Sequence, residues 1–112
     1  DISLSRQNEN IFMTFGLPEN TINKINFVFL KYPEIEEVII YGSRAKGDFR
    51  EGSDIDITLK GETLNERILT HVSIDIDELN TPYLFDISLF NTLKSTSLVD
   101  HINRIGKTLY KK

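Results

Sequence analysis

The 112-residue sequence contains no cysteine. Disulfide bonds and thiolate metal sites are therefore excluded, and any metal site must rely on hard oxygen ligands. The sequence also lacks an apolar run near the roughly 20 residues that a membrane-spanning helix needs. From these two absences we expect a cytoplasmic protein that has no membrane contact.

Positive charge is scarce as well. Lysine and arginine together number 13 against 17 aspartates and glutamates, which gives a net charge of −4 at pH 7. A protein that binds nucleic acid by coating its phosphates needs a basic surface, so direct nucleic-acid binding is not expected. A nucleotide whose charge is neutralised by a metal ion remains compatible with this balance. The length and the 39% of hydrophobic residues are typical of one globular domain.

The first twelve residues differ from the rest of the chain. They are mostly polar, show no clear period and precede the only methionine, Met13. We interpret residues 1–12 as an upstream extension or an addition to the native chain, and residues 13–112 as the domain. The alternative is an extra helical turn that packs on the domain, because Ile11 and Phe12 are apolar.

The hydrophobic pattern of residues 13–112 predicts a small α/β (α+β) domain with a mixed sheet and helices packed on one face. We expect helices over 18–32, 63–79 and 95–109, strands over 37–41, 54–60 and 83–90, and a short helical turn over 43–46. A helix between the second and third strands is typical of a right-handed crossover, so these two strands should be parallel.

Three aspartates lie on the polar sides of two of these strands. Residues 54 to 60 alternate between polar and apolar side chains, so Asp54 and Asp56 point the same way. Asp86 lies on the polar side of the third strand. Carboxylates on neighbouring strands repel one another unless a cation lies between them, and Mg²⁺ prefers such oxygen ligands. The pattern therefore indicates a divalent metal site.

A possible phosphate site lies ten residues before these acids. The first strand ends in Gly42 and Ser43. Glycine lets a backbone approach a phosphate closely, and serine adds an N–H and a hydroxyl group. Arg44 and Lys46 follow, and their charges could offset that of the phosphates. We include Arg44 among the nucleotide-binding residues and leave the role of Lys46 open.

Together, Gly42-Ser43, the ten-residue gap, Asp54-Ile55-Asp56 and the later Asp86 resemble the nucleotidyltransferase fold of the DNA polymerase β superfamily. The likeness is closer to its minimal single-domain members, the MNT proteins, which are typically encoded beside a HEPN-domain protein. It implies that Asp54, Asp56 and Asp86 are catalytic and bind metal, with two Mg²⁺ ions expected. It also implies that Gly42 and Ser43 bind the phosphates of ATP.

The function expected from this resemblance is transfer of AMP from ATP to a hydroxyl group. The expected acceptor is a tyrosine of a HEPN toxin, and the chain would act as the antitoxin of that toxin. Two alternatives stay open. One is a non-catalytic antitoxin that acts by binding, and the other is a nucleotidyltransferase for a small molecule such as an aminoglycoside. A homo-oligomer is compatible with each.

Other candidates are weaker. Asp75 and Asp77 repeat the Asp-x-Asp pattern, but in a helix they point about 200° apart and cannot chelate one ion. His71 and His101 have no second histidine at ligand spacing, so we expect surface or structural roles. We assign the aromatic residues mainly to the core: Phe27, Phe29, Tyr32, Phe85 and Phe90. Tyr83 and Tyr110 are left open.

Overall fold

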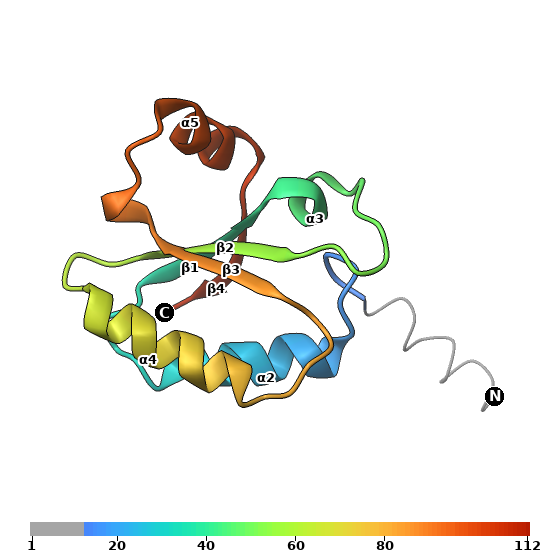
Figure 1. Ribbon diagram of the computed structural model, residues 1–112, viewed down its shortest axis with the longest axis horizontal. Coiled ribbons are helices and arrows are strands. Elements are labelled where there is room, and N and C mark those ends of the chain that lie inside the picture. The colour runs from blue at the N-terminus through green and yellow to red at the C-terminus, as the bar shows by residue number, and fades with distance from the viewer. Residues whose placement is uncertain (1–12) are drawn as a thin grey trace.

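The computed structural model describes residues 13–112, so the interpretation of residues 1–12 lies outside the described residues. The elements follow the expected order up to the last helix (Figure 1). They are α2 (Glu19–Leu30), β1 (Glu37–Tyr41), α3 (Gly42–Lys46), β2 (Ile55–Lys60), α4 (Glu66–Asp77), β3 (Phe85–Leu89), the 3₁₀ turn η1 (Phe90–Thr92), α5 (Thr96–Ile105) and β4 (Lys107–Lys111).

The strands form one mixed sheet in the order β3-β2-β1-β4. β1 is antiparallel to both β2 and β4, whereas β2 and β3 are parallel. The short α3 segment and its loop allow β2 to return beside β1, and α4 provides the crossover that a parallel pair requires. The mixed α/β sheet and the parallel pair predicted from the sequence are confirmed.

The C-terminal segment differs from the sequence prediction. We expected one helix through Leu109, but α5 ends at Ile105 and residues 107–111 form β4. Gly106 makes the change of direction possible, because a Cβ atom there would lie 2.4 Å from the carbonyl oxygen of Ile102. The prediction was wrong because the apolar spacing of this segment fits a helix, while the exposed edge of β1 and a core position for Leu109 favour a strand.

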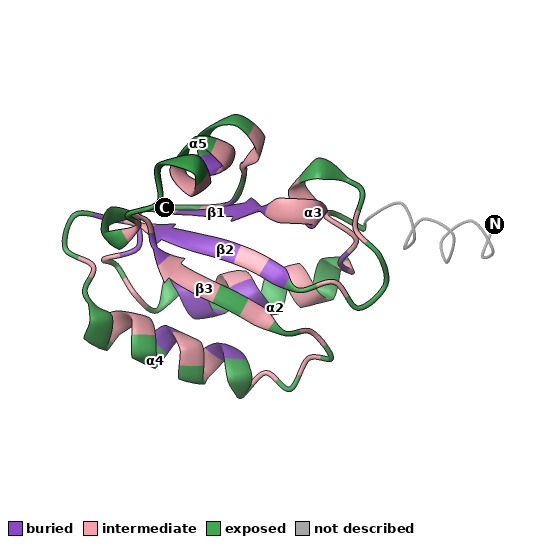
Figure 2. Ribbon diagram, turned by 45° about the horizontal axis from the view of Figure 1, so that its top comes forward, coloured by how far each residue is buried: buried purple, intermediate pink, exposed green. Residues whose placement is uncertain are grey.

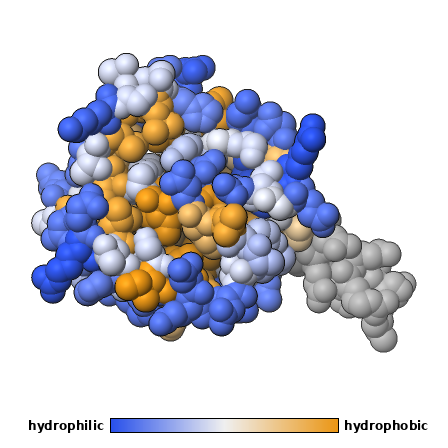
Figure 3. Space-filling view, in the orientation of Figure 1, coloured by the Kyte–Doolittle hydropathy of each residue, from blue (hydrophilic) through white to orange (hydrophobic). Residues whose placement is uncertain are grey.

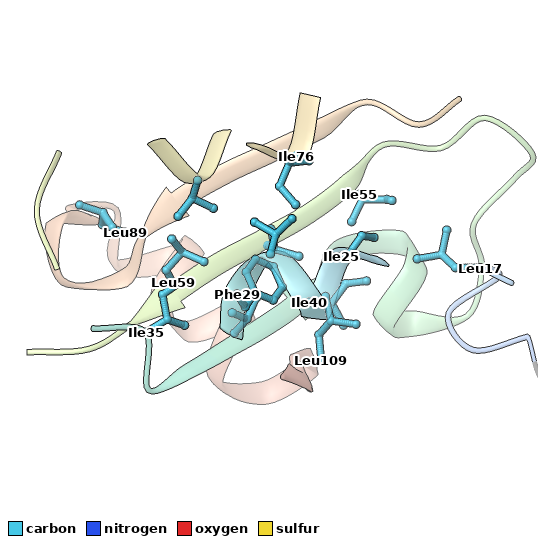
Figure 4. Close-up of a cluster of buried hydrophobic side chains, with 14 residues drawn as sticks. Leu17, Ile25, Phe29, Ile35, Ile40, Ile55, Leu59, Ile76, Leu89 and Leu109 are labelled. Atoms are coloured by element: carbon cyan, nitrogen blue, oxygen red, sulfur yellow. The ribbon is translucent and has the colours of Figure 1, made fainter. Parts of the chain in front are cut away.

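Helices α2 and α4 cover one face of the sheet and enclose the main core (Figures 1 and 2). The alternate apolar residues of β2 point into it, as the pattern predicts. Figure 4 shows the cluster, with Leu17, Ile25, Phe29, Ile35, Ile40, Ile55, Leu59, Ile76, Leu89 and Leu109 labelled. This burial fixes which face of the sheet carries the polar residues.

Helix α5 lies on the opposite face of the sheet from α2 and α4 (Figure 1). We expected all helices on one face of the sheet, and α5 is the exception. A second, smaller cluster holds it there, formed by Ile39 and Tyr41 of β1 and Ile102 of α5. Ile102 is the one buried residue of α5, so this helix is attached to the sheet over a small area.

Most of the aromatic residues assigned to the core do pack there. Phe29 is fully buried, and Tyr32 and Phe85 pack against the same cluster. Phe90 contacts the smaller cluster under α5. The assignment of Phe27 was wrong, because its side chain is 68% exposed on α2.

Charged and polar residues surround the apolar ones on the molecular surface. In the view of Figure 3, apolar residues reach the surface mainly in the middle of the molecule and hydrophilic residues gather around the periphery. No helix within residues 13–112 is both long enough and apolar enough to cross a membrane.

Candidate active site

The centre of the candidate site is a row of three side chains across the sheet. Tyr41 of β1 lies opposite Asp56 of β2, and Asp56 lies opposite Asp86 of β3. Residues in register on neighbouring strands point to the same face, so all three share the face that bears α5. Asp86 is therefore on the same side of the sheet as Asp56, as the metal-site interpretation requires.

Asp54 completes this acidic group. It is exposed and immediately precedes β2, two residues before Asp56. The pKa of Asp56 is raised above its ordinary value, first by burial and then by repulsion from Asp86 and Asp54. None of these three acids forms an ion pair with a lysine or arginine among residues 13–112. Within residues 13–112 the site therefore concentrates negative charge that no lysine or arginine balances.

The Gly42-Ser43 turn borders this acidic group directly. Gly42 has a φ of +73°, a conformation that favours glycine, and it begins the five-residue helix α3. A Cβ atom at this position would lie 2.5 Å from Oδ2 of Asp56. The turn and Asp56 are thus in contact, and a side chain at residue 42 would have to displace the Asp56 carboxylate.

His101 of α5 also reaches this turn, a contact that the sequence interpretation missed. The backbone N–H of Gly42 donates a hydrogen bond to Nε2 of His101, with an N···N distance of 3.3 Å. The imidazole ring meets the ring of Tyr41 edge-on, with 6.2 Å between centroids. No sequence motif indicated this residue, because its position depends on α5 folding over the polar face of the sheet.

Tyr41 occupies the wall of the site between the turn and the acids. Its side chain is buried, and burial is the main reason that the pKa of its hydroxyl group is raised. The charges of Asp86 and Asp56 raise it further. A hydrogen bond with Ser88 acts in the opposite direction and lowers this pKa.

Arg44 is buried and holds two loops together. Its Nε and Nη2 atoms donate to the carbonyl oxygen of Ser53 at 3.2 and 2.9 Å, and Nη1 donates to that of Phe15 at 2.9 Å. The guanidinium group also lies over the rings of Phe49 and Tyr83, about 5 Å from each centroid. Nucleotide binding by Arg44 stays a prediction, and these contacts give the side chain a positioning role in addition.

The donor groups of the site fit a hard divalent cation. Among the described residues the three carboxylates have no lysine or arginine partner, and the pKa of Asp56 is raised first by burial and then by repulsion from Asp86 and Asp54. Within residues 13–112, no group of three acidic or histidine side chains is arranged so that it could bind a metal ion by itself. Mg²⁺ usually takes one or two carboxylates and completes its shell with water and substrate phosphates, so such a group is not required.

Comparisons with known proteins identify the family of the chain. The family model described as Polymerase beta, Nucleotidyltransferase matches residues 23–112. The chain belongs to this nucleotidyltransferase family. Over 81 residues it is 31% identical to a Methanocaldococcus jannaschii protein named "Putative protein adenylyltransferase", an alignment that covers 65% of this chain and 77% of the relative.

Solved structures show the same nucleotidyltransferase fold. A chain from the crystal structure of a toxin–antitoxin with AMP-PNP superposes with a TM-score of 0.65 and 22% identity, covering 81% of this chain and 73% of that one. A chain from the tri-AMPylated HEPN toxin of Shewanella oneidensis in complex with its MNT antitoxin gives 0.60 and 21%, covering 84% and 72%. The polymerase β-type fold expected from the sequence is confirmed.

The second Asp-x-Asp pattern has a structural role. Asp75 and Asp77 lie on α4, as expected. Asp75 accepts a short hydrogen bond from the hydroxyl of Tyr32 and pairs with Nζ of Lys31 at 3.2 Å. These contacts join α4 to the end of α2, so Asp75 is more than a solvated surface residue.

Proposed function

We propose that this nucleotidyltransferase moves AMP from ATP to a tyrosine hydroxyl of a HEPN-domain partner and acts as the antitoxin of that pair. The observation that carries the proposal is the strand register that aligns Asp56 with Asp86 beside the Gly42 turn. The comparisons support the choice of substrate and partner, since they include a protein adenylyltransferase homologue and complexes of HEPN toxins with MNT antitoxins.

The turn and the acids have complementary tasks in this proposal. Gly42 and Ser43 bind the triphosphate, because the glycine leaves the backbone open to close approach and the serine adds a hydroxyl and an N–H. Asp54, Asp56 and Asp86 hold Mg²⁺, which when bound neutralises phosphate charge and polarises the phosphorus under attack. Two ions are expected, as for in-line displacement in other two-metal sites.

We assign Asp86 as the general base that takes the proton of the acceptor hydroxyl group. It is exposed at the edge strand, so a tyrosine of another protein can approach it from solvent. The tyrosine oxygen forms a bond to the α-phosphorus, the bond from that phosphorus to the bridging oxygen breaks, and pyrophosphate leaves. The proton of the tyrosine passes to the carboxylate of Asp86. Positioning and electrostatics supply most of the rate in such a reaction.

The test is to co-express the chain with the product of its neighbouring gene and to weigh that product by intact-mass spectrometry. We expect a mass increase of one or more AMP units with the wild-type chain. We expect no increase with Asp54→Asn, Asp56→Asn or Asp86→Asn. Unchanged modification by these variants would overturn the site assignment.

Toxicity of the partner separates the remaining possibilities. If the triple aspartate variant still protects cells fully, binding rather than transfer is the antitoxin function. If an antibiotic is adenylylated without any partner protein, the acceptor is a small molecule. Cytoplasmic location and a homo-oligomeric state stay predictions.

A further inference from the structure

α5 contributes one side chain to the nucleotide site, and that side chain makes a specific contact. The Nε2 atom of His101 accepts the hydrogen bond from the N–H of Gly42 at 3.3 Å. Because an accepting nitrogen carries no proton, the neutral ring must hold its proton on Nδ1. The contact therefore places the ring directly against the backbone of the turn.

The backbone conformation of Gly42 is limited by its surroundings. Its backbone has positive φ, and its α-carbon faces Asp56 at a distance that excludes a Cβ atom. His101 holds the turn from the α5 side, and its partly buried ring also packs edge-on against Tyr41, the residue before Gly42. Two consecutive residues of the turn thus depend on one imidazole.

The other contacts of α5 do not include a hydrogen bond to the backbone of the turn. The smaller cluster holds α5 to the sheet through Ile102, which packs with Ile39 and Tyr41. On the exposed side of the same helix, Arg104 pairs with Asp100. Of the contacts described, the bond from Gly42 to His101 is the one that ties α5 to the backbone of the phosphate turn.

We propose that His101 is a positioning residue of the nucleotidyl-transfer site, which fixes the Gly42-Ser43 turn in the conformation that binds the triphosphate of ATP. This inference rests on the proposed function in so far as it takes ATP as the nucleotide. In this arrangement the backbone N–H of Gly42 donates to His101, and the backbone N–H of Ser43 donates to the nucleotide. Loss of the contact should therefore weaken ATP binding more than it slows the chemical step.

The test compares three variants of the full chain. His101→Phe keeps a ring beside Tyr41 but removes the acceptor atom, whereas His101→Gln carries an amide oxygen at about the reach of Nε2. His71→Phe is the control, because His71 is exposed on α4. We expect His101→Phe to raise the KM for ATP roughly tenfold, as for a backbone donor left unpaired, with kcat changed by less than about threefold. His101→Gln should restore most of the affinity, and His71→Phe should match the wild type.

The amide resonance of Gly42 in ¹H–¹⁵N spectra reports the contact independently of activity. It should shift in His101→Phe, return toward the wild-type position in His101→Gln and stay unchanged in His71→Phe. An unmoved resonance in His101→Phe would show that the bond does not exist. An unchanged or lower KM for ATP in that variant would show that the bond does not position the turn. Either result overturns the proposal.

Two other experimental results also bear on the role of His101. If His101→Phe does not fold, hydrogen exchange of the wild-type protein decides, because a Gly42 amide without protection contradicts the contact and a protected one supports it. If the wild type transfers no AMP to any partner, the proposed function fails, while titration of the Gly42 and Ser43 resonances with ATP still tests the role of His101.

Discussion

Gly42 and Asp56 touch across the β1–β2 pair, with only 2.5 Å between Oδ2 of Asp56 and the place where a Cβ atom of residue 42 would lie. The contact joins the two halves of the candidate site, the Gly42-Ser43 turn and the group of acids around Asp56. A side chain at residue 42 would therefore have to displace the carboxylate of Asp56.

The first prediction concerns this contact. Gly42→Ala should reduce AMP transfer by at least about a hundredfold, because the new methyl group displaces the central acid from its place beside the turn. The assay is transfer of radioactive AMP to the partner at saturating ATP.

Gly47→Ala is the matched control for that substitution. Gly47 also has positive φ, but no atom lies within 4 Å of its Cβ position. Backbone strain alone should then cost about 1 kcal/mol of stability and leave most of the transfer intact. Equal loss of transfer in the two variants would show that strain, rather than displacement of Asp56, explains the Gly42 result.

The second prediction is that Asp56→Asn stabilises the fold while it abolishes transfer. The folded state raises the pKa of Asp56 through burial and through the charges of Asp86 and Asp54. A raised pKa means that the contribution of the group to stability is present at low pH and is lost as pH rises through the folded pKa. At neutral pH the charged carboxylate therefore destabilises the fold, and its removal should raise the Tm by a few degrees.

Thermal unfolding at several pH values checks this prediction. The gain in Tm should be largest near pH 7 and should vanish below the ordinary pKa of an aspartate. Added Mg²⁺ should raise the Tm of the wild type and should have little effect on Asp56→Asn. A lower Tm for Asp56→Asn at pH 7 would contradict the electrostatic account of the site.

The third prediction separates the two roles of Arg44. Arg44→Lys keeps a positive charge but cannot make three N–H contacts with the carbonyls of Ser53 and Phe15. Because Ser53 directly precedes Asp54, the variant should lose about 1–3 kcal/mol of stability and should lower kcat as the loop loosens. Urea unfolding and steady-state kinetics measure these effects. A higher KM for ATP with normal stability would instead favour a phosphate-binding role.

The fourth prediction concerns the joint between α2 and α4, which lies away from the site. Tyr32 donates a hydrogen bond to Asp75, and burial together with this bond raises the pKa of its hydroxyl to about 12. Tyr32→Phe should lose about 1 kcal/mol of stability at pH 7 and keep full transfer activity. Urea unfolding gives the energy, and the AMP-transfer assay serves as the internal control.

The pH dependence of this joint has a defined sign. A raised tyrosine pKa gives stability that is present below pH 10 and is lost as pH rises toward 12, because the unfolded chain ionises first. The advantage of the wild type over Tyr32→Phe should therefore disappear across that range. A constant difference up to pH 12 would contradict the raised pKa of Tyr32.

The shared face of the candidate acids could be predicted from sequence because these residues lie on or beside short, regular strands. The two-residue period of β2 and β3 puts Asp54, Asp56 and Asp86 on one face whenever the apolar positions are buried. His101 could not be found this way, since its contact with Gly42 joins residues that are 59 positions apart and on different elements. The positioning contacts of Arg44 were also missed, because a sequence shows its charge but not the carbonyl oxygens around it.

The amino-acid sequence by itself determined the mixed α/β pattern, the acidic face and the glycine turn, because side-chain alternation and glycine conformations are local properties. Only the tertiary structure decided that residues 107–111 become an edge strand, that α5 covers the polar face and that His101 meets Gly42. The physical reason is that these features depend on which apolar surface is left to bury once the sheet has formed, and that is a property of the whole fold.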